Sequence, residues 1–190
     1  MDQDQDQEPA LGWVPIEGRG SLPFALVHGE SLLATASWAL GEAGVQLVDQ
    51  GTEPELVRRS GRPLVLHDPL CPMTPPQFLA EAVALAARTG AIVVGHRPVT
   101  DTVKPLSGPL EGGLLGATVD RSGLVGVTSP VVIPGEVLAR LDQLRTDDFP
   151  ALVDRLAEEF GVRLLEAPAA GRRVHEEADI AVLEALTRAD

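Results

Sequence analysis

Short apolar segments and longer segments with helical spacing alternate along most of the chain. The apolar segments, which predict strands, lie at residues 11–16, 45–48, 63–67, 91–94, 124–133 and 162–165. The segments in which apolar residues recur every three or four positions, which predict helices, lie at residues 32–40, 75–88, 135–144, 147–160 and 176–188. A turn is expected at residues 53–59. This alternation predicts an α/β fold with a doubly wound, mostly parallel sheet, whose ligands lie outside the carboxyl ends of the strands.

One excursion interrupts the alternation between residues 98 and 133. Two short segments rich in Thr and Val flank a Gly-rich centre, a pattern that predicts an extended β-hairpin arm. The arm carries polar side chains away from the core at Asp101, Thr102, Lys104, Asp120 and Arg121. These residues are either exposed ion pairs, which contribute little free energy, or contacts for a ligand, because functional residues concentrate on such segments.

Composition narrows the class of protein. The chain has 190 residues, of which 44% are hydrophobic, so it can bury a core without disulfides, and its single Cys71 cannot form an intrachain bridge. With 15 basic and 28 acidic side chains, the formal net charge is −13, which argues against a nucleic-acid partner. Neither a signal-peptide pattern nor a long uncharged apolar span is evident, so we expect a cytoplasmic protein with no membrane partner.

Residues 1–10 are expected to be a disordered acidic tail, and residues 11–190 a single domain with a dimerisation arm at about 98–133.

A candidate site follows the apolar strand predicted at residues 63–67. Asp68 stands directly after this strand, at the edge where a doubly wound sheet opens its crevice. A carboxylate there suits a magnesium ion that bridges nucleotide phosphates. The alternative is structural, because Asp before Pro69 is a common turn residue that hydrogen-bonds its own backbone.

A second candidate site is the loop at residues 16–24, between the first strand and the first helix. Gly18, Arg19 and Gly20 are its candidate cofactor-binding residues. Glycine lets a backbone approach phosphate closely and offers N–H donors beside a helix N-terminus, and Arg19 adds a cation. The same two glycines also suit an ordinary turn.

Taken in order, several motifs resemble the methylerythritol phosphate cytidylyltransferase family. Residues 98–104 and 118–121 of the arm match the family's PVxDTxK and TxxR motifs. Residues 67–72, His-Asp-Pro-Leu-Cys-Pro, resemble its HDAARP motif. Residues 146–148, Thr-Asp-Asp, match its TDD motif, and residues 172–179 are similar to IKxTxxEDL. The combination indicates a member of this family.

The resemblance implies a Rossmann-like nucleotidyltransferase fold with a protruding β-arm. It implies a homodimer through the arm, with composite sites in which CTP transfers a cytidylyl group to a small phosphorylated sugar alcohol, with Mg²⁺ and release of pyrophosphate. Asp68, as the metal ligand, and Arg173, at the family's lysine, take the catalytic positions. The implied substrate-binding residues are Asp101, Thr102, Lys104, Arg121, Ser129 and Thr146. For Thr146 a purely structural role as the N-cap of the helix predicted at 147–160 is the alternative.

Departures from the family pattern concentrate on the nucleotide side. The loop at residues 16–24 is several residues shorter than in the family, Leu22 and Phe24 stand at its arginine and lysine positions, and Cys71 stands at the arginine of HDAARP. Loss of one preorganised charge-stabilising group costs about 10² to 10³ in rate, and three such losses approach about 10⁶, the lower end of whole enzymatic accelerations. The sequence therefore predicts a cytidylyltransferase-family protein with weakened or lost catalysis. The alternative is a non-catalytic sugar-phosphate-binding or regulatory homologue, a pseudoenzyme that acts as a dimer or as the partner of a true transferase.

Overall fold

The computed structural model describes residues 8–49, 51–144 and 148–188. Within these residues a six-stranded sheet has the strand order β10-β6-β9-β5-β1-β4. Its strands are β1 (Leu11–Trp13), β4 (Gln46–Leu47), β5 (Leu64–Leu66), β6 (Ile92–Pro98), β9 (Val125–Ile133) and β10 (Val162–Glu166). β9 runs antiparallel to β5 and β6, whereas the other neighbours pair in parallel. The predicted α/β fold with a mostly parallel sheet is confirmed.

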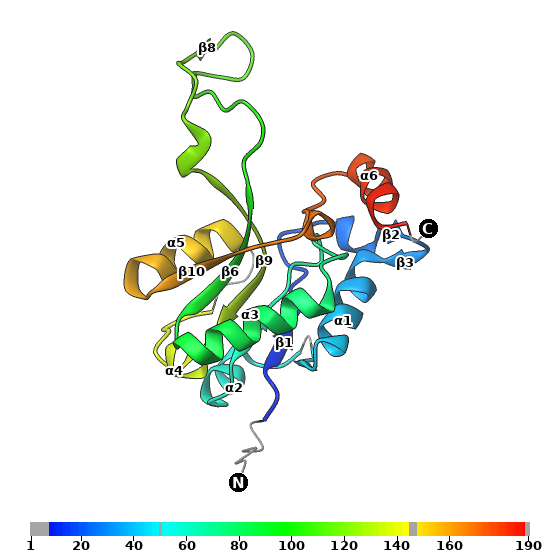
Figure 1. Ribbon diagram of the computed structural model, residues 1–190, viewed down its shortest axis with the longest axis vertical. Helices are drawn as coiled ribbons and strands as arrows, with labels where there is room; N and C mark the ends of the chain where they lie inside the picture. Colours follow the sequence, from blue (N-terminus) through cyan, green and yellow to red (C-terminus); the bar gives the residue numbers. More distant parts are fainter. Residues whose placement is uncertain (1–7, 50, 145–147, 189–190) are drawn as a thin grey trace.

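Helices cover both faces of this sheet (Figure 1). They are α1 (Leu32–Glu42), α2 (Pro54–Arg59), α3 (Pro76–Thr89), α4 (Gly135–Leu138) and α5 (Phe149–Glu159). α1 and α3 pack on one face, against Val65 of β5 and Val132 of β9. α2, α4 and α5 pack on the other face, against Leu66 and Val131. The two apolar clusters alternate along each strand because successive strand side chains point to opposite faces.

The ends of the two long helices follow from particular residues. Ser31 caps α1, since its Oγ accepts the backbone N–H of Ala34 over 3.1 Å. α3 begins with Pro76 and ends at Gly90, whose φ of 63° is left-handed and whose N–H donates to the carbonyl of Ala86 over 2.9 Å. The helix predicted at residues 75–88 is therefore confirmed to within one residue at either end.

The arm grows from the extended ends of β6 and β9 and projects away from the body (Figure 1). β6 and β9 pair as far as Pro98 opposite Val125. At the tip, β7 (Leu106–Ser107) pairs antiparallel with β8 (Leu114–Leu115). The predicted hairpin is thus present, and the returning limb includes the short 3-10 turn η2 (Arg121–Gly123).

A small second layer near the C-terminus was not predicted in full. β2 (Leu26–Val27) and β3 (Glu30–Ser31) form a hairpin that the sequence pattern did not reveal, because each strand has only two residues. The predicted C-terminal helix is α6 (Ala178–Thr187), and it packs on this hairpin. The cluster between them holds Val27, Leu32, Leu70, Val174, Ile180 and Leu183.

Three predicted elements differ from the structure. The turn at residues 53–59 is the helix α2, and the helix at 135–144 is only the four residues of α4, after which the backbone continues in i→i+3 bonds such as Arg140 N–H to Val137 O, 3.0 Å. The helix at 147–160 begins at Phe149, and its N-cap is Asp148, whose Oδ1 accepts the N–H of Ala151 over 3.1 Å.

The prediction of Thr146 as the N-cap of α5 is therefore wrong. Pro150 has no N–H and is best tolerated in the first turn of a helix, so the helix has to begin close to it. Thr146 itself lies outside the described residues.

No helix in the described ranges is both long enough and apolar enough to cross a membrane.

Candidate functional site

Asp68 lies just past the carboxyl end of β5 and is 1% exposed. Its Oδ1 accepts the Nε–H of Arg19 over 2.8 Å and the backbone N–H of Leu70 over 3.1 Å. Its Oδ2 accepts the Nε–H of Arg173 over 3.0 Å. Three residues predicted as site residues, Arg19, Asp68 and Arg173, are thus brought together from distant parts of the chain, and we call them the Asp68 centre.

Opposing electrostatic effects act on this carboxylate. Burial by itself raises the pKa of Asp68, but the charges of Arg19 and Arg173, with hydrogen bonds from Arg19 and Leu70, outweigh burial and hold the pKa below its ordinary value of 3.8. Asp68 is therefore ionised at neutral pH. Removal of one partner from a buried ion pair costs about 3–5 kcal/mol, which applies to the buried pair of Arg19 and Asp68, whereas solvent screens the partly exposed pair of Arg173 and Asp68.

Arg19 is held by its loop as well as by Asp68. Its Nη1 donates to the carbonyl of Glu17 over 2.6 Å, and its guanidinium lies 5.3 Å from the ring centroid of Phe149. Gly18 and Gly20 on either side have φ of 75° and 58°, a left-handed conformation that glycine adopts without strain. This conformation turns Arg19 inward, with 8% of the residue exposed, and agrees with the turn interpretation of the two glycines.

Ser129 of β9 lies behind the carboxylate. Its Oγ accepts the backbone N–H of Asp68 over 2.9 Å and lies 2.5 Å from Nδ1 of His67. Ser129 and His67 are fully buried, and burial lowers the pKa of His67 to about 4 although the charge of Asp68 acts in the opposite direction. Gly95 on β6 permits this packing, because a Cβ there would lie 2.4 Å from the Ser129 carbonyl oxygen. Ser129, a predicted substrate-binding residue, therefore supports Asp68 from inside the fold.

The three positions that depart from the family's cations have different surroundings. Cys71 is a free, fully buried thiol, and burial, together with the charge of Asp68, raises its pKa to about 12. Its Sγ lies 3.9 Å from Oγ1 of Thr128. Leu22 packs on the cluster beneath α6, whereas Phe24 is 56% exposed.

The arm residues lie apart from the Asp68 centre. Asp101, Thr102 and Lys104 are exposed, and so is Arg121, whose Nη1 donates across the arm to the carbonyl of Thr100. Across the described ranges, no hydrogen bond or ion pair joins these four side chains to Asp68 or Arg173. Thr146, the other predicted acceptor residue, is outside those ranges. The single chain thus presents the predicted site in two separate parts.

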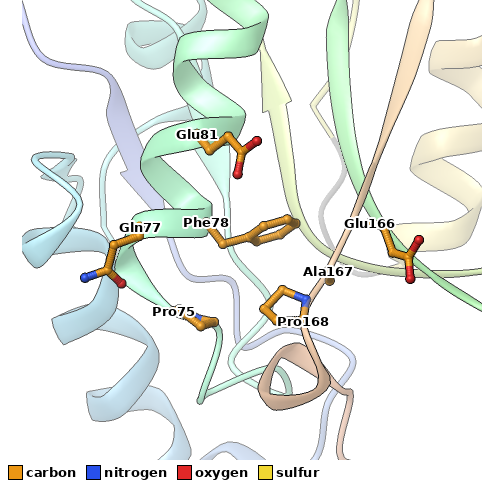
Figure 2. A pocket seen from close by; sticks show the side chains of 7 residues that line it. All are labelled: Pro75, Gln77, Phe78, Glu81, Glu166, Ala167 and Pro168. Carbon is orange, nitrogen blue, oxygen red and sulfur yellow. The ribbon is translucent and has the colours of Figure 1, made fainter.

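A pocket of about 460 Å³ lies between the start of α3 and the end of β10 (Figure 2). It is lined by Pro75, Gln77, Phe78, Glu81, Glu166, Ala167 and Pro168. None of the predicted site residues lines it. Two carboxylates, Glu81 and Glu166, border it, so it is poorly suited to a phosphate group.

A comparison with family models found no match for this chain. The chain is similar to the 2-C-methyl-D-erythritol 4-phosphate cytidylyltransferase of Chlorobium phaeobacteroides (strain BS1), with 31% identity over 147 residues, 74% of this chain and 55% of that protein. The protein of the same name from Chlorobium luteolum is 30% identical over 132 residues, 66% of this chain and 54% of the relative. The solved structure of the protein of that name from Thermus thermophilus matches with a TM-score of 0.68 and 23% identity over 95% of this chain and 98% of that one.

The chain belongs to the methylerythritol phosphate cytidylyltransferase family. The identity of 23% to the Thermus structure shows the fold alone, and the chain spans about half the length of the curated relatives it matches. The resemblance stated from the motifs is therefore confirmed at the level of the family and the fold.

The magnesium expected in this cytidylyltransferase family does not fit Asp68 as the structure presents it. Magnesium needs carboxylate oxygens that are free to coordinate it in near-octahedral geometry. Both oxygens of Asp68 accept charged N–H groups, from Arg19 and Arg173. The described part of the chain also holds no group of three His, Cys, Asp or Glu residues arranged for a metal.

Sequence reasoning missed residues that hold the centre together. His67 lies at the end of a continuous apolar segment, which predicts burial but no partner. Thr128 donates from Oγ1 to the carbonyl of Gly171 over 3.1 Å and so ties β9 to the segment that carries Arg173. Phe149 beneath Arg19 had no signal beyond its apolar character. Contacts between residues so distant in sequence leave no mark in local patterns.

Proposed function

We propose that this chain is a dimeric, cytoplasmic cytidylyltransferase-family protein that binds CTP and a small phosphorylated sugar alcohol, and that its catalysis is weakened or lost. Family membership supports the substrates, because the curated relatives are named for cytidylyl transfer to 2-C-methyl-D-erythritol 4-phosphate. One observation supports the loss of catalysis: each carboxylate oxygen of Asp68 already accepts a hydrogen bond, one from Arg19 and the other from Arg173.

The chemistry of the reaction explains why the pairing of Asp68 with these arginines would slow catalysis. An oxygen of the acceptor phosphate attacks the α-phosphorus of CTP, the bond between the α-phosphorus and the bridging oxygen breaks, and pyrophosphate leaves with the bonding electron pair. Catalysis of such a step depends on positioning and on cations that stabilise the developing negative charge. In this chain Leu22, Phe24 and Cys71 cannot supply such cations, and Arg19 is paired with Asp68.

The acceptor side is better preserved. In the proposed dimer the arm of one subunit carries Asp101, Thr102, Lys104 and Arg121 to the body of the other, where Thr146 completes the acceptor site and the buried Ser129 supports it through the backbone of Asp68. The exposure of these arm residues and the projection of the arm support this arrangement (Figure 1). Arg121 suits a phosphate, because its planar guanidinium can donate two parallel hydrogen bonds.

A second candidate is a binding protein without catalysis, either a sensor of phosphorylated metabolites or a partner of a true transferase. One observation favours it: the carboxylate of Asp68, which would take part in the reaction, is already paired with Arg19 and Arg173 of the same chain.

Pyrophosphate release separates the two candidates. The protein is incubated with CTP, 2-C-methyl-D-erythritol 4-phosphate and Mg²⁺, beside the relative from Chlorobium phaeobacteroides, and binding of each substrate is measured by calorimetry. We expect binding of the acceptor and release at least about a thousandfold slower than by the relative. Acceptor binding with no release favours the binding protein. Release at the relative's rate contradicts the proposed loss, and no binding of either substrate contradicts the proposed function.

A further inference from the structure

The Asp68 centre contains two cations for one anion, and the two cations differ in accessibility. The side chains of Arg19 and Asp68 are each 2% exposed, whereas that of Arg173 is 35% exposed. Arg19 has a second anchor in the carbonyl of Glu17 and lies over Phe149. Arg19 is therefore a fixed internal counterion, whereas Arg173 connects the buried carboxylate with the surface.

Arg173 keeps donors available on its exposed side. Its Nε–H is bonded to Asp68, and its two Nη groups make no hydrogen bond to any residue in the described ranges. A guanidinium whose Nε is fixed by a buried carboxylate presents its Nη groups in a defined orientation, which lowers the entropy lost when they bind an anion. The whole chain has a formal net charge of −13, which repels anions over long range, so any anion held here has to be bound by local donors such as those of Arg173.

We propose that Arg19 and Arg173 replace the divalent cation at Asp68, so that the Asp68 centre takes no Mg²⁺ or Mn²⁺ and binds a phosphate group through the exposed end of Arg173 without a metal ion. The geometry supports both parts. A divalent cation at Asp68 would have to displace two charged N–H donors and would then lie beside two guanidinium groups of like charge. The phosphate contact rests on the proposed function, which supplies the identity of the nucleotide. The exclusion of metal is independent of the proposed function.

Mn²⁺ alone tests the exclusion of metal. The protein is titrated with Mn²⁺, and the free ion is followed by its electron paramagnetic resonance signal. We expect the free signal to match that of buffer, with the wild type and Asp68→Asn behaving alike. Loss of free signal in the wild type that is absent in Asp68→Asn overturns the proposal.

Inorganic tripolyphosphate tests the phosphate contact. Its affinity is measured by calorimetry in excess EDTA and in Mg²⁺, for the wild type, Arg173→Gln and the matched control Arg172→Gln, whose side chain makes no hydrogen bond to Asp68 within the described residues. We expect binding in EDTA that is weakened at least about tenfold by Arg173→Gln and less than about twofold by Arg172→Gln. Binding only with Mg²⁺, no binding at all, or equal effects of the two variants overturns the proposal.

These results are distinguishable from a failure of the proposed function. If tripolyphosphate binds in EDTA and CTP does not bind, the cytidine nucleotide is wrong and the metal-free phosphate contact stands. If Mn²⁺ binds at Asp68 and CTP binds with it, the contact proposed here is wrong and the proposed function stands.

Discussion

Nδ1 of His67 lies 2.5 Å from Oγ of Ser129, and the same oxygen accepts the backbone N–H of Asp68 over 2.9 Å. This relationship fixes the turn that follows β5 from the side of β9. It also places a fully buried imidazole directly behind the buried ion pairs of Asp68. The packing of one serine thus positions the backbone of the candidate site.

The buried His67 gives the fold a dependence on pH. Its pKa is about 4 in the folded protein and 6.5 when unfolded, so the unfolded state takes up a proton first as the pH falls. The protonation of His67 therefore does not reduce the free energy of unfolding above pH 6.5. Between pH 6.5 and pH 4 it lowers that free energy by roughly 3 kcal/mol in all. Asp68, whose pKa is also depressed, lowers the free energy of unfolding only when the pH falls below 3.8, the ordinary pKa of its carboxyl group. Urea unfolding at a series of pH values measures this loss.

His67→Gln is the variant that isolates this effect. It retains a hydrogen-bonding side chain beside Ser129 but has no titrating ring. We expect it to be less stable than the wild type at pH 7, with a flatter dependence on pH between 6.5 and 4. An unchanged slope in the variant would show that the loss arises from other groups.

Restoring the family's arginine at Cys71 is expected to damage the fold. Cys71 is fully buried and its thiol is packed near Thr128, so an arginine there would be overpacked, and its desolvated charge would lie near Asp68, whose two oxygens already accept hydrogen bonds from Arg19 and Arg173. We expect Cys71→Arg to lower the free energy of unfolding by about 3 kcal/mol or more, and Cys71→Ala by about 1 kcal/mol. Urea unfolding and CTP calorimetry check both consequences. A stable Cys71→Arg variant that binds CTP more tightly would contradict this account.

Exposed leucines on the arm are expected to form the subunit interface. Leu115 is 70% exposed and Leu114 77%, both on β8, where a single chain offers nothing to bury them. We expect the wild type to be a dimer in light scattering, and Leu115→Asp to weaken the dimer at least about tenfold, because burial of a leucine contributes roughly 1.5–3 kcal/mol. Leu56→Asp on α2, at 63% exposure, is the matched control and should leave the dimer intact. A wild type that is monomeric at every concentration rules out the composite site.

Local patterns predicted the elements whose signals are local. α3 had prolines at its start, an apolar stripe and Gly90 at its end, so its bounds were predicted to within one residue. For the arm, the pattern predicted its presence but not its detail: the Thr- and Val-rich segments at 99–104 and 117–120 are not strands, and residues 131–133 of β9 pair with β5 in the central sheet. The two-residue strands β2 and β3 were too short to give an alternating pattern. Pro150 marked the start of α5 more reliably than the cap-like Thr146.

The site required information that spacing does not contain. Asp68 and Arg173 are 105 positions apart, and no periodicity indicates that they are bonded. The family motifs placed both residues in the site, but as a metal ligand and a catalytic cation rather than as an ion pair. Partners of that kind follow from the sheet topology, which brings the ends of β5 and β10 towards the same edge and is fixed only when the strand order is known.

Variants of Arg121 distinguish a role in ligand binding from a role in supporting the structure of the arm. It is exposed and bonds only the backbone carbonyl of Thr100 among the described residues, so Arg121→Ala should leave the melting temperature of the unliganded protein nearly unchanged. In the wild type, 2-C-methyl-D-erythritol 4-phosphate should raise the melting temperature, because a ligand selective for the native state stabilises it. Arg121→Ala should abolish that rise and Arg121→Lys should retain part of it, since one ammonium cannot donate two parallel hydrogen bonds. Arg163→Ala, an exposed arginine on β10, is the control and should keep the full rise. If Arg121→Ala responds to the ligand as the wild type does, the arm does not contribute to the acceptor site.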